Sequence, residues 1–127
     1  MPIESTINNA EKIIYSTCSG IMTQEDFDHY IDRVWRTNEH YYFNEVFDTT
    51  QADWNDFEFN YLFHVAKAAA SLNTINPETK LAWVVLEGKQ KELTDFYKAA
   101  KSLTLANSRG LEAFYSKDKA MDWLQNM

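Results

Sequence analysis

The sequence predicts an α/β fold: a mixed, largely parallel sheet of four or five strands with an N-terminal hairpin and about four helices. The spacing of apolar residues switches repeatedly between the alternation typical of strands and the three- or four-residue spacing typical of helices. The resulting order is β-β-α-β-α-β-α-β-α, and strands that alternate with helices form right-handed crossovers in a parallel sheet. A length of 127 residues suits one domain, so we expect residues 1–127 to fold as a single unit.

The first two strands are expected at residues 3–7 and 12–18. Asn8 and Asn9 between them are typical of a turn, so the two strands should form an antiparallel hairpin. Gly20 is expected to end the second strand.

A helix should follow, because Thr23 and Asp26 have the spacing of a capping box. Apolar residues then recur on one helical face: Phe27, Tyr30, Ile31, Val34 and Trp35. Polar residues fall on the other face: Asp28, His29, Asp32, Arg33 and Arg36. This helix should end near Asn38.

The middle of the chain predicts a strand, a helix and a second strand. Residues 42–47 are aromatic and β-branched, which favours a strand. Asn55 and Glu58 have the spacing of a second capping pair, before a helix that ends in a loop at 73–77. The continuous apolar run 81–86 is typical of a strand covered on both faces.

The last third of the chain repeats this alternation. Gly88 should end the strand, and an apolar stripe over residues 93–103 predicts another helix. Arg109 and Gly110 are expected to close that helix, since glycine often follows a helix end. A last strand at 111–115 and a short helix capped by Ser116 complete the chain.

The charge balance argues against nucleic acid and membranes as partners. Twelve basic against 19 acidic residues give a net charge of -7, and no cluster of Lys and Arg is present to neutralise phosphates. The single cysteine, Cys18, excludes an internal disulfide and suits a reducing compartment. Without a signal-like N-terminus or a long apolar run, we expect a cytoplasmic protein without membrane insertion.

No residue set predicts catalysis, so we expect neither an enzyme nor a cofactor. Asp48 and Thr49 are expected at the carboxyl end of a strand, where open α/β sheets bind ligands. The simpler interpretation is that they bond to a loop and start a turn. Cys18 has no histidine placed beside it as a base, and the three histidines lack metal-ligand spacing.

The aromatic surplus near the second predicted helix allows two interpretations. Trp54 and Phe57 flank a loop and a helix start, where exposed rings can anchor a partner or line an apolar cleft. The alternative is a second layer of core beneath the loop. The neighbouring acids Asp56 and Glu58 have a structural explanation, because negative charge stabilises a helix N-terminus.

Four segments together resemble the SpoIIAA-like branch of the STAS-like superfamily, which contains bacterial anti-sigma-factor antagonists. They are the end of the hairpin, an aspartate-ended strand, an apolar strand and the last helix, at residues 18–23, 46–48, 82–85 and 120–124. The resemblance covers nearly the whole chain and implies a protein-interaction module, related in fold to lipid carriers of the CRAL-TRIO type.

The resemblance also implies where a partner would bind. The anti-sigma-factor antagonists carry an Asp-Ser-Ser-Gly turn at a helix start, and a partner kinase phosphorylates one serine. If Asp48 is the strand-ending aspartate, this turn falls on residues 56–59, which keep Asp56 but lack both serines and the glycine. Glu58 then stands where phosphate charge would appear, with one charge rather than nearly two.

Two non-enzymatic functions therefore follow from the sequence. The first is an interaction module that binds a protein partner or a second copy through Asp48, Thr49, Trp54, Asp56, Phe57 and Glu58. The alternative is a domain that binds a small apolar or amphipathic, lipid-like ligand in a helix–sheet cleft near Trp54, Phe57 and Phe63.

Overall fold

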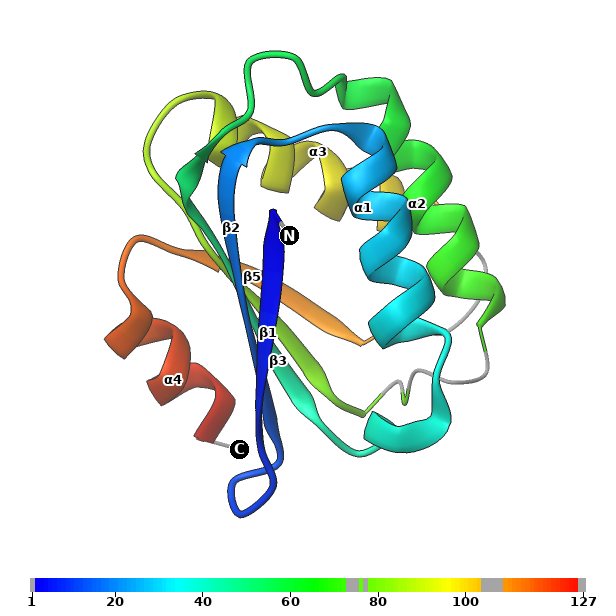
Figure 1. The fold of residues 1–127 in the computed structure, drawn as a ribbon, viewed down its shortest axis with the longest axis vertical. Coiled ribbons are helices and arrows are strands. Elements are labelled where there is room, and N and C mark those ends of the chain that lie inside the picture. The colour runs from blue at the N-terminus through cyan, green and yellow to red at the C-terminus, as the bar shows by residue number, and fades with distance from the viewer. Residues whose placement is uncertain (1, 73–75, 77, 104–108, 126–127) are drawn as a thin grey trace.

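The computed structural model describes residues 2–72, 76, 78–103 and 109–125 (Figure 1). Its five strands are β1 (Ile3–Asn8), β2 (Ile13–Ile21), β3 (Asn44–Asp53), β4 (Lys80–Val84) and β5 (Gly110–Phe114). They form one sheet in the order β1-β2-β3-β4-β5, which is also their order along the chain. Only β1 and β2 are antiparallel, and the other neighbours are parallel. The expected mixed, largely parallel sheet is confirmed.

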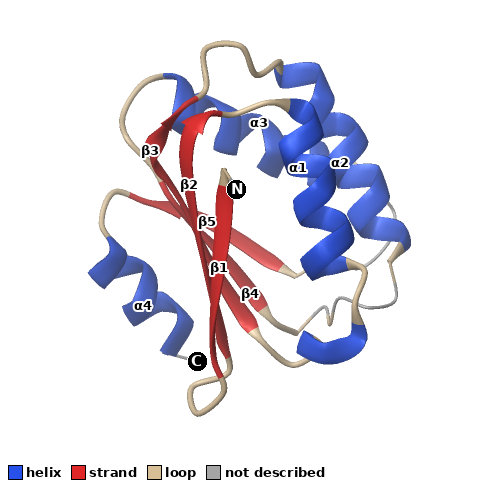
Figure 2. Ribbon diagram, in the orientation of Figure 1, coloured by secondary structure: helices blue, strands red, loops and turns tan. Residues whose placement is uncertain are grey.

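The helices are α1 (Gln24–Tyr30), α2 (Phe59–Ser71), α3 (Lys89–Ser102) and α4 (Lys117–Gln125). A π-helical turn, η1 (Ile31–Trp35), extends α1, and a short 3-10 helix, η2 (Asn38–His40), follows it. Each crossover moves one strand onward in the same direction, and right-handed crossovers of that kind place their helices on one face. Accordingly α1, α2 and α3 cover one face of the sheet, and α4 lies on the other (Figure 2).

The start of the chain follows the expected local signals. The carboxamide oxygen of Asn8 accepts a hydrogen bond from the main-chain N of Glu11 (3.0 Å), which closes the hairpin turn. The Thr23 hydroxyl accepts from the main-chain N of Asp26 (3.2 Å), and the Asp26 carboxylate accepts from the main-chain N of Thr23 (3.1 Å). The capping box at the start of α1 is therefore confirmed.

Several expected element ends are wrong. β2 continues through Gly20 because Gly20 pairs with Ala52 of β3, which itself runs to Asp53. β3 also begins at Asn44 rather than at Tyr42, whose side chain is exposed. Gly110 does not close a helix, since it begins β5. The loop expected at 73–77 falls mostly outside the described residues.

Two apolar layers hold the sheet between its helices. The larger lies under α1, α2 and α3 and centres on Phe27, whose ring contacts the rings of Phe47 (5.5 Å between centroids) and Phe57 (6.0 Å). The smaller lies under α4 and includes Val46, Ala82, Val84, Ala120 and Leu124. Residues of β4 alternate between the two layers, which confirms a strand covered on both faces.

A buried carboxylate, Glu45, lies near the start of β3 within the larger layer. It accepts hydrogen bonds from the Tyr30 hydroxyl, from Nε1 of Trp35 (3.0 Å) and from Nη2 of Arg109 (2.8 Å). Its position was not anticipated, because a charged side chain in a strand is usually exposed unless it is paired. Arg109, which directly precedes β5, supplies that pairing.

Within the described residues, no helix is both long enough and apolar enough to cross a bilayer.

Candidate functional site

Asp48 and Thr49 lie inside β3 and not at its carboxyl end, because the strand continues to Asp53. The Asp48 carboxylate accepts hydrogen bonds from the main-chain N (2.9 Å) and the hydroxyl (2.7 Å) of Thr50. The buried Thr49 hydroxyl donates to the main-chain O of Val84 (2.9 Å). The expectation that these two residues form the strand end is wrong, and Thr49 is inaccessible to a partner.

Cys18 also lies within its strand, since β2 continues to Ile21. Its side chain is completely buried, and this burial, with smaller effects of Asp48 and Glu45, raises the pKa of the thiol. A protonated, inaccessible thiol is not a nucleophile. In the described part of the chain, no three His, Cys, Asp or Glu side chains are grouped to hold a metal ion.

Trp54 and Phe57 belong to the core beneath the loop that leads into α2. Their side chains are 4% and 1% exposed, and their rings meet at 5.0 Å between centroids. Nε1 of Trp54 donates to the main-chain O of Thr49 (3.1 Å), so even its polar atom is used inside the fold. Phe63 is exposed on α2, so the three rings do not line the expected helix–sheet cleft. Of the two interpretations, the second core layer is correct.

The exposed part of this loop carries the two acids, Asp56 and Glu58. Glu58 is the residue that precedes α2, yet its side chain makes no capping hydrogen bond. The expected capping pair with Asn55 is therefore absent, and the main-chain N of Asn55 instead donates to Asp53 (2.9 Å). Both carboxylates thus project from a chain segment that Trp54 and Phe57 anchor in the core.

Lys89 at the start of α3 borders the same surface. Its Nζ donates to the main-chain O of Asn55 (2.7 Å) and lies 5.8 Å from the centre of the Phe59 ring. Residues 55–60 and Lys89 line an open hollow of about 710 Å³. We call this hollow, with the carboxylates of Asp56 and Glu58, the acidic loop surface.

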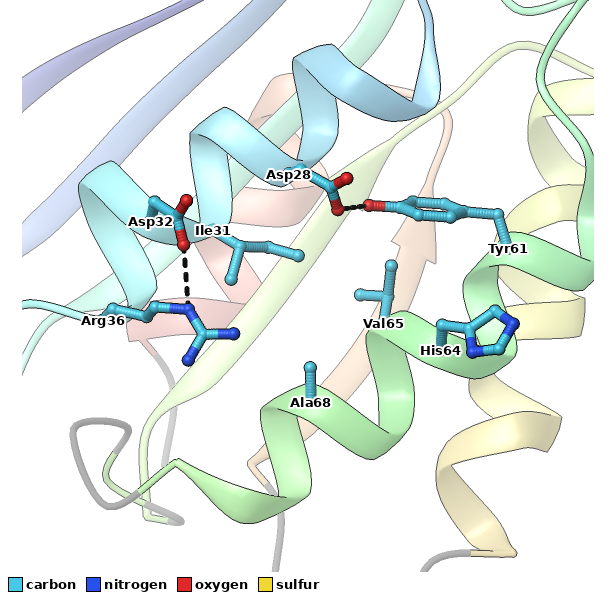
Figure 3. Close-up of a pocket in the computed structure, with 8 residues that line it drawn as sticks. All are labelled: Asp28, Ile31, Asp32, Arg36, Tyr61, His64, Val65 and Ala68. Atoms are coloured by element: carbon cyan, nitrogen blue, oxygen red, sulfur yellow. Dashed lines mark hydrogen bonds and ion pairs between the residues drawn. The ribbon is translucent and has the colours of Figure 1, made fainter.

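A second hollow, of about 340 Å³, lies between α2 and the helix formed by α1 and η1 (Figure 3). Its lining residues are Asp28, Ile31, Asp32, Arg36, Tyr61, His64, Val65 and Ala68. The Tyr61 hydroxyl donates to Asp28 across the hollow, and Arg36 pairs with Asp32 (2.9 Å) on one wall. We call this hollow the α1–α2 groove.

No protein-family model matches the chain, and no curated protein matches it. The structure is similar to the crystal structure of an uncharacterised protein of the DUF3478 family from Shewanella loihica, described as having a SpoIIAA-like fold. The TM-score is 0.58 at 14% sequence identity, and the match covers 96% of this chain and 91% of the other. The chain has a SpoIIAA-like fold. The resemblance inferred from the sequence is confirmed at the level of the fold.

Within the SpoIIAA-like fold, the acidic loop surface lies directly before the helix that follows β3. Of the six residues expected to form this surface, Asp56 and Glu58 are exposed, Asp48 is half-buried, and Thr49, Trp54 and Phe57 are buried. Sequence reasoning missed the α1–α2 groove. The spacing of Asp28, Asp32 and Arg36 places them on one helical face, but it does not reveal that Tyr61 and His64 of α2 lie opposite.

Proposed function

We propose that this SpoIIAA-like chain is a non-enzymatic interaction module whose acidic loop surface binds a protein partner. The observation that carries the proposal is the exposure of Asp56 and Glu58 on a segment anchored by two buried rings. Because the anchor holds the segment in place, binding requires little ordering of the loop, which lowers its entropic cost.

Charge defines the chemistry of the partner. Asp56 and Glu58 contribute two negative charges, and the nearby Lys89 is engaged with the main-chain O of Asn55 and the Phe59 ring. A partner surface that carries Lys or Arg side chains is complementary to these carboxylates.

The resemblance to anti-sigma-factor antagonists supports the same surface. Their phosphorylated turn precedes a helix, as residues 56–58 precede α2 here. The carboxylate of Glu58 is a permanent charge, so we infer an interaction that no phosphorylation of a serine in this turn controls.

The experiment is a quantitative pull-down from the host lysate with charge-reversal variants. We expect Asp56→Lys and Glu58→Lys each to capture at least about tenfold less of the partner than wild-type protein does, since like charges across an interface are repulsive. The matched control is Glu4→Lys, an exposed residue of β1. Affinity is then measured by calorimetry with the purified partner. If the captured partner is a second copy of this chain, the same measurement is made on its self-association. Equal capture by the wild-type protein, the two loop variants and the Glu4→Lys control would refute the proposal.

A further inference from the structure

The α1–α2 groove combines an apolar floor with charged walls, and it lies apart from the acidic loop surface. Ile31 and Val65 are buried, and with Ala68 they form the floor. Asp28, Asp32, Arg36 and His64 are exposed around it (Figure 3). A volume of about 340 Å³ falls in the range of sites for small molecules. The lining suits a molecule that has both an apolar body and a polar end.

The groove wall contains an unusual piece of backbone. η1 is a π-helical turn in which the main-chain N of Arg36 donates to the main-chain O of Ile31 (3.0 Å), five residues earlier. Such turns are rare and often occur at functional sites. Ile31 and Asp32 are the first two residues of this turn, and Arg36 directly follows it. An irregularity in the helix therefore coincides with the residues that line the groove.

The charges in the groove favour a cation. Asp32 is compensated by Arg36 at 2.9 Å, whereas Asp28 receives a neutral donor, the Tyr61 hydroxyl, on one of its two oxygens. Burial raises the pKa of Tyr61, and Asp28 and Asp32 raise it further. The end of the groove formed by Asp28 and Tyr61 thus has a negative potential.

We propose that the α1–α2 groove binds a small amphipathic cation, with a protonated amine at Asp28 and an apolar body on Ile31, Val65 and Ala68. The carboxylate supplies the charge-assisted hydrogen bond, and the floor supplies apolar area that the ligand removes from water. This function is additional to the partner binding proposed above and uses none of the same residues.

The test is a titration of isotope-labelled protein, followed by amide chemical shifts, with phenethylamine as the probe. We expect saturable shifts in residues 28–36 and 61–68, and affinity about tenfold weaker for the neutral alcohol 2-phenylethanol. The anion 3-phenylpropanoate should bind still more weakly, because Asp28 repels it. No saturable shift at the groove up to about 10 mM phenethylamine would overturn the proposal, as would equal affinity for amine and alcohol.

Variants test whether phenethylamine binds in the α1–α2 groove and not elsewhere on the surface. Asp28→Asn should weaken phenethylamine binding about tenfold, and Asp122→Asn on the exposed side of α4 is the matched control. Ala68→Arg provides a second variant, since its long cationic side chain fills the groove and should abolish binding. The amide spectrum of each variant reports whether it is folded. Unchanged affinity in folded Asp28→Asn and Ala68→Arg would refute the groove as the site.

Discussion

Nη2 of Arg109 lies 2.8 Å from Oε1 of Glu45, and both side chains are buried. The same carboxylate receives the Tyr30 hydroxyl and the Trp35 indole, and the Arg109 guanidinium lies over the Trp35 ring (5.5 Å). The pair thereby connects β3 with α1, with η1 and with the segment that leads into β5. Its charges are desolvated, so their mutual attraction and these hydrogen bonds must offset the cost of burial.

Removing one partner of this pair should destabilise the fold strongly. We expect Arg109→Met to lower the free energy of unfolding by roughly 3–5 kcal/mol, because Glu45 is left as an unpaired buried charge. The double variant Glu45→Gln with Arg109→Met should lose less than Arg109→Met alone, since it leaves no unpaired buried charge. The amide oxygen of glutamine can still accept from Nε1 of Trp35, and its NH2 group can donate to the Tyr30 hydroxyl oxygen. Urea denaturation of the three proteins measures both differences. A loss below about 1 kcal/mol in Arg109→Met would contradict the expected role.

Buried and exposed aromatic residues should differ sharply in their effect on stability. Phe57→Ala should cost roughly 3–5 kcal/mol, because it opens a cavity in the core beneath the loop. Tyr42→Ala is the control: Tyr42 is 68% exposed, so its removal should change stability by about 0.5 kcal/mol or less. Thermal or urea unfolding gives both values, and similar losses in the two variants would argue against the core position of Phe57.

Local patterns in the sequence were sufficient to predict the fold class. The capping box of Thr23 and Asp26 and the continuous apolar run of β4 depend on neighbouring residues alone, so they could be recognised without the tertiary structure. Regular alternation of strands and helices then fixed the largely parallel sheet through the handedness of crossovers.

Features that depend on distant contacts were not predictable in the same way. β3 continues past Asp48 because its main chain pairs with β2 as far as Asp53, which lies opposite Ile21. Burial of Glu45 requires Arg109, which lies 64 residues away. The α1–α2 groove likewise exists only because two helices lie side by side, which periodicity within either helix does not encode.

The capping box should contribute measurably to stability. Thr23→Ala removes the hydroxyl that accepts from the main-chain N of Asp26 (3.2 Å), so we expect a loss of roughly 0.5–2 kcal/mol in the free energy of unfolding. Gln24→Ala is the matched control, because Gln24 is the first residue of α1 but does not belong to the capping box. Circular dichroism during urea denaturation measures both changes. Equal effects of the two substitutions would mean that the cap is not formed in solution.

Burial of Cys18 should make stability fall at alkaline pH. Burial raises the pKa of its thiol above the ordinary value of 9.0, so the folded protein retains a proton that the unfolded chain releases. The contribution of the protonated thiol to the free energy of unfolding is fully present below about pH 9. It is lost as the pH rises further, by up to about 1.4 kcal/mol per pH unit. Cys18→Ala should be less stable at neutral pH because of the cavity it leaves, yet its stability should decline less steeply above pH 9. The comparison cancels the titration of the buried tyrosines, which both proteins share. Urea denaturation from about pH 7 to pH 10.5 tests this, and parallel pH profiles for the two proteins would show that the thiol titrates normally in the fold.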